Sequence, residues 1–370
     1  MSKNFLLFVI GTRPEAIKLA PLIKAFQANN ANFTVSVCST GQHREMVNEV
    51  LTFFNIHIDV NLDIMQARQS LFDITTRCMT GLEKVLNDIK PDWVFVQGDT
   101  TTAFVGALAA FYLKIKVAHV EAGLRSFNKY APFPEEMNRK FISHVADIHF
   151  AATENNRENL LKEGIEPANI HIVGNTVVDA LHWTLNKMQQ NRVIFKDIDF
   201  SKKIILVTAH RRENWGVGIE NIITAISNIL KNRDDIEFVL PLHPNPIVSE
   251  PFKNQFSDNP NVHLLPPLSY EHFVDLMNQS YIILTDSGGV QEEAISLRKP
   301  VLVMRNITER SEGIDMRNAV LVGTHSDVIE KTIYKLLDNN VLYTEMTQGR
   351  NPYGDGNTSD RILAIMTTIA

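Results

Sequence analysis

The stretch WVFVQGDTTTAFVGALAAFYLKIKVAHVEAGLRS, residues 93–126, has the pattern of a strand, a helix and a second strand. WVFVQ (93–97) and KVAHV (116–120) are short runs rich in β-branched and aromatic residues, as in strands covered on both faces. Between them, threonines that can cap a helix precede the apolar run FVGALAAFYL (104–113). This order predicts a parallel sheet with right-handed crossovers.

The same alternation of strand and helix recurs along most of the chain. Other runs of the same kind lie at 5–10, 33–39, 148–152, 170–174, 203–209, 238–243, 262–267, 281–286 and 300–305. The rhythm lapses over 175–200, which has the pattern of one helix and a polar connector. We therefore predict an α/β fold of two Rossmann-like, doubly wound domains facing a central cleft, residues 1–175 and 176–357. The last helix, 358–370, can pack on either domain, including back on the first.

Composition and charge exclude several classes of protein. Lysine and arginine number 36 against 42 aspartates and glutamates, a net charge of −6, so a nucleic-acid partner is not expected. The longest apolar stretch, 104–113, is about half the ~20 residues that cross a bilayer. The N-terminal run FLLFVI (5–10) lacks the basic leader and cleavage site of a signal peptide, so we expect it to be a buried strand. The two cysteines, Cys38 and Cys78, make no disulfide framework, and the twelve histidines do not cluster as metal ligands. We expect a cytoplasmic protein without a membrane span or a metal.

Polar motifs follow the predicted strands of the first domain, where ligands bind in open α/β sheets. Arg13 and Lys18 in GTRPEAIK (11–18), a turn allowed by Gly11, can hold an anion or can be surface cations. Asp99 in QGDTTTAF and Glu121 in VEAGLRS place carboxylates after two successive strands, which weakens helix capping as an explanation for both.

PFPEEMNR (132–139) adds two acids at the start of a helix. Glu135 and Glu136 occupy its first turn after Pro134, where the helix dipole alone could account for them. Glu135 can also pair with Arg139 at the i,i+4 spacing.

The second domain contributes basic and glycine-rich strand ends. His210 in TAHRREN is followed by Arg211 and Arg212, a grouping that suits a phosphate. His243 also follows a predicted strand, but it is a weaker candidate for the same role. TDSGGVQEEA (285–294) is the strongest single signal. Its Ser287, Gly288 and Gly289 can present backbone N–H groups to a diphosphate at a helix N-terminus. We expect Glu292 and Glu293 in the first turn of that helix, so a simple capped helix is the alternative. NITERSEG then adds Thr308, Glu309 and Arg310.

Several catalytic fingerprints are missing from the sequence. GxGxxG, GxxxxGK[ST], HExxH and GxSxG do not occur, so hydride transfer, nucleotide hydrolysis, zinc proteolysis and serine esterase chemistry lose support.

The motifs GTRPEAIKLAP, QGDTTTAF, HVEAGLRS, PFPEEMNR, TAHRREN, LTDSGGVQEEA and PVLVMRNITER together resemble the non-hydrolysing UDP-N-acetylglucosamine 2-epimerases of bacteria. The resemblance runs in order from Gly11 to NPYGDG (351–356). It implies a glycosyltransferase-B-like fold, a homodimer, and reversible conversion of UDP-GlcNAc to UDP-ManNAc without any cofactor. The implied route eliminates UDP to form 2-acetamidoglucal and adds it back, and the product supplies ManNAc for surface polysaccharide.

The resemblance also implies roles for individual residues. Asp99, Glu121 and Glu135 become the acid–base groups, with no assignment of which serves which face of C2, and His210 joins them as a catalytic residue. The implied substrate-binding residues are Arg13, Lys18, Arg139, Phe273, Ser287, Gly288, Gly289, Glu293 and Arg310, with Glu293 on the ribose and Phe273 beside the uracil.

Some bacterial relatives bind a second UDP-GlcNAc as an activator. The matching positions are Gln42, His43, Arg68, Gln69, Glu136, Arg211 and His243. This chain departs from those relatives at Glu45, where they usually carry glutamine, and the added negative charge near a diphosphate puts the activation in doubt.

Three other functions stay open at this point, because a fold and a nucleotide clamp do not set the reaction. A glycosyltransferase of the same architecture would need an acceptor groove. A hydrolysing epimerase would release free ManNAc and UDP. A nucleotide-sugar sensor would keep the Ser287–Gly289 turn and tolerate loss of Asp99 and Glu121.

Overall fold

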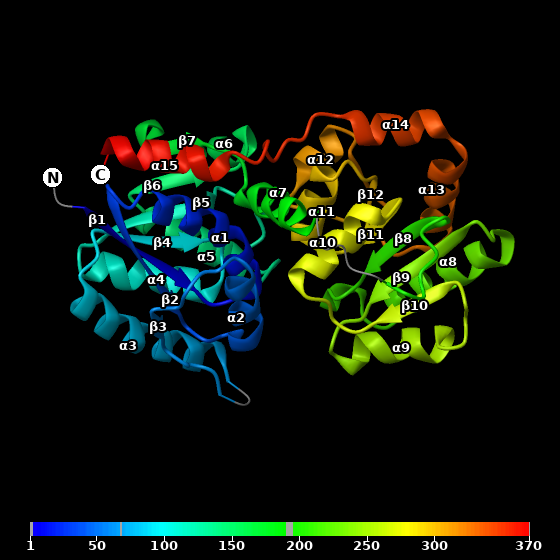
Figure 1. Cartoon of the computed structure of the whole chain (residues 1–370), viewed down its shortest axis with the longest axis horizontal. Helices are drawn as coiled ribbons and strands as arrows, with labels where there is room; N and C mark the ends of the chain where they lie inside the picture. Colours follow the sequence, from blue (N-terminus) through cyan, green and yellow to red (C-terminus); the bar gives the residue numbers. More distant parts are fainter. Residues whose placement is uncertain (1–2, 67–68, 190–194, 370) are drawn as a thin grey trace. The chain divides into compact units, whose positions relative to one another are not determined.

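Two parallel sheets organise the chain in the computed structural model, which describes residues 3–66, 69–189 and 195–369 (Figure 1). The first sheet has seven strands in the order β3-β2-β1-β4-β5-β6-β7, and the second has six in the order β10-β9-β8-β11-β12-β13. Helices connect successive strands, as parallel pairing requires. The predicted α/β class with two doubly wound sheets is confirmed.

The elements of the first sheet and its helices are short and regular. They are β1 (Asn4–Ile10), α1 (Arg13–Ala28), β2 (Phe33–Ser39), α2 (Arg44–Phe53), β3 (Val60–Asn61), α3 (Leu71–Ile89), β4 (Trp93–Gln97), α4 (Thr101–Tyr112), β5 (Lys116–Ala122), α5 (Glu135–Val145), β6 (Ile148–Ala151), α6 (Glu154–Lys162), η1 (Pro167–Asn169), β7 (Ile170–Ile172) and α7 (Thr176–Met188).

The second sheet follows the same rhythm. Its elements, with the C-terminal helix, are β8 (Lys203–Thr208), η2 (Arg212–Asn214), α8 (Val217–Asn232), β9 (Ile236–Pro241), α9 (Pro246–Phe256), β10 (Val262–Leu265), α10 (Tyr270–Gln279), β11 (Ile282–Thr285), α11 (Gly288–Ser296), β12 (Val301–Val303), α12 (Ser311–Asp315), β13 (Ala319–Leu321), α13 (Ser326–Asp338), α14 (Asn340–Gln348) and α15 (Thr358–Ile369).

The chain divides into two compact units. Unit 1 comprises Met1–Trp183 and Tyr353–Ala370, and unit 2 comprises Thr184–Pro352. Helix α7 therefore starts in unit 1 and ends in unit 2, while α15 returns to unit 1 and packs against α1. The polar connector predicted after α7 falls partly on residues 190–194, outside the described residues.

Each strand-like run of the sequence contains a strand, but two edge strands escaped prediction. β3 has two residues and β13 has three, too few for a hydrophobic period to be recognised. Both lie at sheet edges, where pairing with a single neighbour is enough to define a strand.

Alternate residues of β1 pack on opposite faces of the first sheet, as the period of two requires. Leu7 and Val9 join a core with apolar residues of α3, α4 and α5. Phe8 points the other way and stacks on Phe95 with ring centroids 4.7 Å apart, beside Phe26 of α1 at 6.0 Å. Both faces are thus buried.

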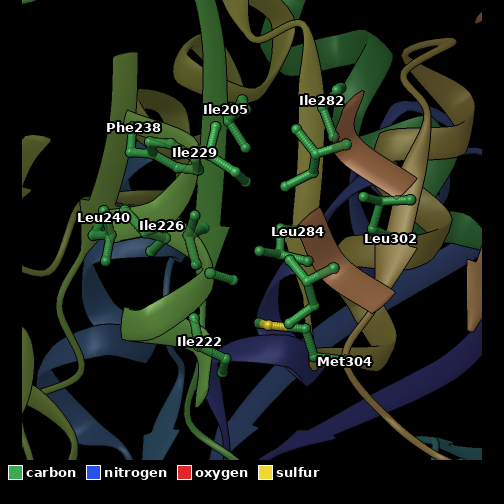
Figure 2. Packing of buried hydrophobic residues seen from close by; sticks show 14 of the residues in the cluster. Ile205, Ile222, Ile226, Ile229, Phe238, Leu240, Ile282, Leu284, Leu302 and Met304 are labelled. Atoms are coloured by element: carbon green, nitrogen blue, oxygen red, sulfur yellow. The ribbon is translucent and has the colours of Figure 1, made fainter. Parts of the chain in front are cut away.

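The core of unit 2 is built in the same way. Ile222, Ile226 and Ile229 line one face of α8 and pack on the side chains of neighbouring strands (Figure 2). Phe238 of β9 and Leu284 of β11 belong to the same cluster.

In both sheets the strand order reverses at one place, between β1 and β4 and between β8 and β11. Loops at such a switch point diverge and leave room for a ligand at the carboxyl ends of the strands. The predicted motifs after β1, β4, β8 and β11 lie there. In the part of the chain that the structure describes, no helix is long and apolar enough to cross a bilayer.

Candidate active site

A buried ion pair lies at the carboxyl end of the first sheet. Glu121, the next-to-last residue of β5, has a left-handed backbone conformation, φ 62°, at a register shift between Val120 and Ala122. Its carboxylate oxygens are 2.7 and 2.6 Å from Nζ of Lys18, which reaches across from α1. Both side chains are less than a tenth exposed. An ion pair removed from water holds both charges in place only where geometry and further hydrogen bonds are good.

Two amides supply those further hydrogen bonds. Gln97, the last residue of β4, donates from Nε2 to Oε2 of Glu121. Asn175, which follows β7, donates from Nδ2 to Oε1 at 3.0 Å. Sequence reasoning missed both residues, although each stands at a strand end, the signal that identified Asp99 and Glu121.

Asp99 belongs to a second cluster at the same edge. Its Oδ2 accepts from Nε of Arg139 at 2.8 Å and lies 2.7 Å from the same guanidinium's Nη2. Nη1 of Arg139 also donates to Oε2 of Glu136 at 3.1 Å. Glu136 is buried and accepts from the backbone N–H groups of Ser126 and Phe127. The structure therefore brings Asp99, Glu136 and Arg139 together.

Two further predicted residues open helices beside these clusters. Glu135 is the first residue of α5 and is half-buried. Arg13 is the first residue of α1, also half-buried, next to the N-cap Thr12. Both positions lie at helix N-termini, where backbone N–H groups and the helix dipole favour an anion.

Glu15 was not singled out by the sequence, yet it is fully buried at the start of α1. Its carboxylate accepts from the backbone N–H groups of Gly11 and Thr12 at 2.9 and 2.6 Å, and from Oγ1 of Thr100 at 2.6 Å. Burial raises its pKa to about 7, against the lowering effect of those hydrogen bonds. The residue ties the turn after β1 to the N-cap of α4.

The raised pKa of Glu15 makes stability depend on pH. Between pH 4.5, its ordinary pKa, and about 7, the folded state holds a proton that the unfolded state has lost. The stability that this proton gives the folded state is complete below pH 4.5 and is lost as the pH rises through about 7. We compare the unfolding free energy of wild type with that of Glu15→Gln at each pH. We expect this difference, wild type minus variant, to be about 2–3 kcal/mol smaller at pH 8 than at pH 5. Urea unfolding at both pH values measures it, and a constant difference would contradict the buried, protonated state.

His210 and Asp286 form the centre of the candidate site in unit 2. Asp286 is buried at the end of β11 and lies 2.8 Å from Nδ1 of His210. It also accepts from the backbone N–H groups of His210 and Arg211, both at 2.9 Å, and from Nδ2 of Asn214 at 3.0 Å. Burial acts to raise the pKa of Asp286, but the hydrogen bonds from His210 and the backbone outweigh it and keep the pKa low.

This contact fixes the tautomer of the His210 ring. An ionised carboxylate accepts the Nδ1 hydrogen, so Nε2 is the nitrogen directed away from Asp286. The ring is 38% exposed and lies 6.2 Å from that of His243, nearly parallel to it. Burial lowers the pKa of His243, and its neighbour His210 lowers it further. The sequence contained Asp286 within TDSGG but we had not singled it out.

Helix α11 starts two residues earlier than predicted, at Gly288, which corrects the place of its acids. Ser287 is the N-cap, and Gly288 and Gly289 are the first helical residues. Glu292 and Glu293 therefore lie in the second turn and are buried, so they do not interact with the helix N-terminus as we expected. A Cβ on Gly288 would lie 2.6 Å from the guanidinium of Arg310, so a larger residue there would displace that guanidinium.

Arg310 is buried in a network of charges over that helix. Its Nε donates to Glu292 at 2.8 Å, and its Nη1 lies 2.6 Å from Glu309. Glu309 also contacts Arg305 at 2.8 Å, with Arg211 at 3.9 Å. Burial acts to raise the pKa of Glu309, but these cations hold it well below its usual range. Several arginines are thus concentrated beside the first turn of α11.

The remaining predicted residues are placed individually. Phe273 lies on α10, Gln42 accepts from Thr102 at 3.2 Å, His43 is the N-cap of α2, and Gln69 donates to the Ile64 carbonyl at 2.6 Å. Burial lowers the pKa of His43. Arg68 lies outside the described residues. Within the described ranges, no group of three or more His, Cys, Asp or Glu residues could hold a metal ion.

The chain is similar to known proteins over nearly its whole length. Residues 24–367 match the sequence model of the UDP-N-acetylglucosamine 2-epimerase family. UDP-N-acetylglucosamine 2-epimerase of Campylobacter jejuni is 48% identical over 98% of this chain and 97% of its own.

Solved structures give the same result. The UDP-GlcNAc 2-epimerase of Neisseria meningitidis, bound to UDP-GlcNAc, has a TM-score of 0.94 and 47% identity, covering 98% of this chain and 100% of its own. The enzyme of Methanocaldococcus jannaschii, in complex with UDP-GlcNAc and UDP, has a TM-score of 0.85 and 35% identity over 98% of this chain and 99% of its own.

Proposed function

This chain belongs to the UDP-N-acetylglucosamine 2-epimerase family, and we propose that it epimerises UDP-GlcNAc at C2 by eliminating UDP and adding it back. The observation that carries the proposal is the pair of acid clusters at neighbouring strand ends of unit 1. Glu121 is held by Lys18, and Asp99 is held by Arg139. Proton transfer at both faces of one carbon requires two ionisable carboxylates that lie apart in different surroundings.

The chemistry accounts for the number of acids. C2 of the sugar has no adjacent carbonyl, so a carbanion formed there has no enolate to stabilise it. If the C1–oxygen bond breaks as a carboxylate takes the C2 proton, its electrons leave with UDP and a C1–C2 double bond forms. The product, 2-acetamidoglucal, then accepts a proton at the opposite face of C2 while the diphosphate oxygen rebinds C1. There is no net oxidation, so the route needs no redox cofactor.

Asp99, Glu121 and Glu135 are the proposed acid–base residues, without assignment to one face or the other. Glu121 keeps a cation at both oxygens, whereas Asp99 shares Arg139 with Glu136. The two carboxylates thus lie in different surroundings, as the proposal of one acid and one base requires.

The diphosphate is proposed to bind the basic groups. In unit 2 these are His210, Arg310 and the N-terminus of α11 at Ser287, Gly288 and Gly289; in unit 1 they are Arg13 and Lys18. The support is the arginine network beside α11 and the orientation of His210 by Asp286. Preorganised donors of this kind stabilise charge as it develops on a leaving group. Glu293 is proposed for the ribose and Phe273 for the uracil.

One experiment tests the proposed reaction against its alternatives. The protein is incubated with UDP-GlcNAc in deuterated water, and the sugar C2 is followed by NMR. Formation of UDP-ManNAc with solvent deuterium at C2 supports elimination and re-addition. Release of free ManNAc and UDP would indicate a hydrolysing enzyme. Consumption of UDP-GlcNAc only when a sugar acceptor is added would indicate a glycosyltransferase, and binding without any reaction would indicate a sensor.

We also propose that the product supplies ManNAc for surface polysaccharide, on the basis of the identity of the product alone.

We propose that a second UDP-GlcNAc activates the enzyme, through Gln42, His43, Arg68, Gln69, Glu136, Arg211 and His243. Glu45, in the first turn of α2, opposes this because it adds negative charge near the activator's diphosphate. A sigmoidal rate curve in UDP-GlcNAc, with UDP-ManNAc turned over only when UDP-GlcNAc is present, supports activation. A hyperbolic curve with UDP-ManNAc turned over alone contradicts it.

A homodimer is proposed from an apolar surface on α4 and α5, formed by Phe104, Phe111 and Phe141. Phe104 and Phe111 are seven residues apart on one helix face, and the Phe104 ring lies 5.4 Å from that of Phe141. Phe111 and Phe141 are 53% and 46% exposed in the single chain. Exposed aromatic clusters of this kind usually mark protein interfaces.

We expect light scattering to give about twice the chain mass of 41.8 kDa for wild type and the single mass for Phe111→Asp/Phe141→Asp. The two aspartates would be desolvated at the interface without partners, which is costly. Phe72→Asp, an exposed aromatic at the start of α3, is the matched control. A monomeric wild type, or a dimeric double variant, would refute this surface as the interface.

A further inference from the structure

Asn175 is buried between the end of β7 and the start of α7, and both ends of its side-chain amide are engaged. Nδ2 donates to Oε1 of Glu121 at 3.0 Å, and Oδ1 accepts from the backbone N–H of Val177 at 3.1 Å. A flipped amide would place an acceptor against the carboxylate and a donor against an N–H group. The orientation of the amide is therefore determined by its two partners.

The backbone of Asn175 is held as firmly as its side chain. Its N–H donates to the carbonyl of Tyr353 at 2.7 Å, where the chain re-enters unit 1. The preceding Gly174 has φ +94°, and a Cβ there would lie 2.8 Å from Oγ1 of Thr358. One turn along α7, Asp179 accepts from the backbone N–H groups of Thr358 and Ser359 at 3.2 and 2.6 Å. Two segments far apart in sequence thus fix the place of Asn175.

The partners of Glu121 have two different roles: Lys18 neutralises its charge, and two amides set its orientation. Lys18 contacts both carboxylate oxygens, so it neutralises the group without setting its rotation, as expected of a flexible point charge. The two amides each take a different oxygen, Asn175 on Oε1 and Gln97 on Oε2. Two directional donors on different oxygens define the plane of the carboxylate.

We propose that Asn175 is a positioning residue for the reaction: it orients the Glu121 carboxylate toward its substrate proton while the Tyr353 segment holds Asn175 itself. This proposal rests on the acid–base role of Glu121 proposed above. Positioning of a reacting group within a fraction of an ångström is worth large factors in rate, because a misplaced base must be reoriented in each turnover. Asn175 is itself buried and is proposed to act through Glu121.

Two substitutions separate positioning from the capping of α7. Asn175→Asp keeps the size and the Oδ1 acceptor for Val177, but replaces the donor facing Glu121 by a second carboxylate. Asn175→Ser is also a good helix cap but is too short to reach Glu121. We expect both variants to lower kcat for UDP-GlcNAc by about 10- to 100-fold with KM changed less than about threefold. Asn175→Asp should have the lower kcat, because it adds repulsion to the lost hydrogen bond.

Asn339→Asp is the matched control, because Asn339 caps α14 by the same contact, accepting from the N–H of Val341 at 3.0 Å, and is exposed. It should keep wild-type kcat and KM. Thermal melting of all variants checks folding. If Asn175 served only as a cap, both of its variants would turn over UDP-GlcNAc at the wild-type rate, and that result would overturn the proposal.

A second measurement does not depend on turnover. The protein is labelled with glutamate carrying ¹³C at the side-chain carboxyl, and the Glu121 resonance is assigned by its loss in Glu121→Gln. We expect the Glu121 resonance of substrate-free protein to shift in Asn175→Asp and Asn175→Ser and to stay in place in Asn339→Asp. An unmoved resonance in both Asn175 variants rejects the positioning role. If the resonance shifts in the Asn175 variants but the wild type does not epimerise UDP-GlcNAc, only the proposed function of Glu121 is rejected.

Discussion

Glu121→Gln is expected to lower kcat for UDP-GlcNAc epimerisation by about 10²- to 10⁴-fold, the contribution of one positioned acid–base group. Glutamine has the same shape but neither takes up nor releases a proton at neutral pH. It also leaves Lys18, less than a tenth exposed, without its anion. The variant should therefore lose both C2–deuterium exchange and epimer formation, as measured by NMR in deuterated water.

The control for this prediction is another glutamate of unit 1. Glu154→Gln removes a carboxylate that pairs with Arg157 on the surface, 61% exposed, and it should leave kcat unchanged. Circular dichroism and urea unfolding of Glu121→Gln establish that the variant is folded. Turnover by folded Glu121→Gln within tenfold of wild type would remove Glu121 from the acid–base set, and Asp99 and Glu135 would have to serve both faces of C2.

His210→Ala is expected to lower kcat by roughly two orders of magnitude, since one preorganised donor to developing charge contributes about 2.7–4 kcal/mol. The ring is held by Asp286 with Nε2 directed away from that carboxylate, so it is ready to meet the diphosphate before substrate binds. Arg13→Ala should have an effect of the same order, because it removes a cation beside the N-terminus of α1. Steady-state kinetics of both variants measures these losses.

The matched control is His325→Ala, which removes an exposed histidine that precedes α13 in the same unit. It should keep wild-type kinetics. His210→Asn is a second test, because an amide can replace part of the hydrogen bonding without the charge. It should lie between alanine and wild type. Near-normal kcat for His210→Ala would show that the leaving diphosphate is stabilised without this ring.

Long buried strands and the motifs at their ends could be predicted from the amino-acid order. WVFVQ and KVAHV became β4 and β5, and Asp99 and Glu121 follow or end them as the pattern required. β3 and β13 could not be predicted, because two or three residues have no periodicity and their pairing depends on the strand beside them. The predicted start of α11 was also wrong, because glycine has a weak helix propensity and yet Gly288 and Gly289 are its first helical residues.

Gly11 shows a second limit of the sequence pattern. We expected glycine there to permit a turn, but a Cβ at Gly11 would lie 2.1 Å from Oγ1 of Thr102. The close approach of α4 to the turn after β1 is therefore a sufficient reason for glycine. A contact between residues 91 positions apart cannot be predicted from the local sequence around either residue.

The local amino-acid sequence was enough to determine the α/β class and the succession of strands and helices. It also identified the strand ends that carry acids, arginines and histidine. Propensity and hydrophobic period act over a few residues, so the sequence reports them directly. The partners of each functional group were decided only by folding. Lys18, Gln97 and Asn175 meet at Glu121 from separations of 103, 24 and 54 residues, and Asp286 meets His210 across 76. These contacts depend on the order of strands within a sheet, which is set by packing of the whole unit.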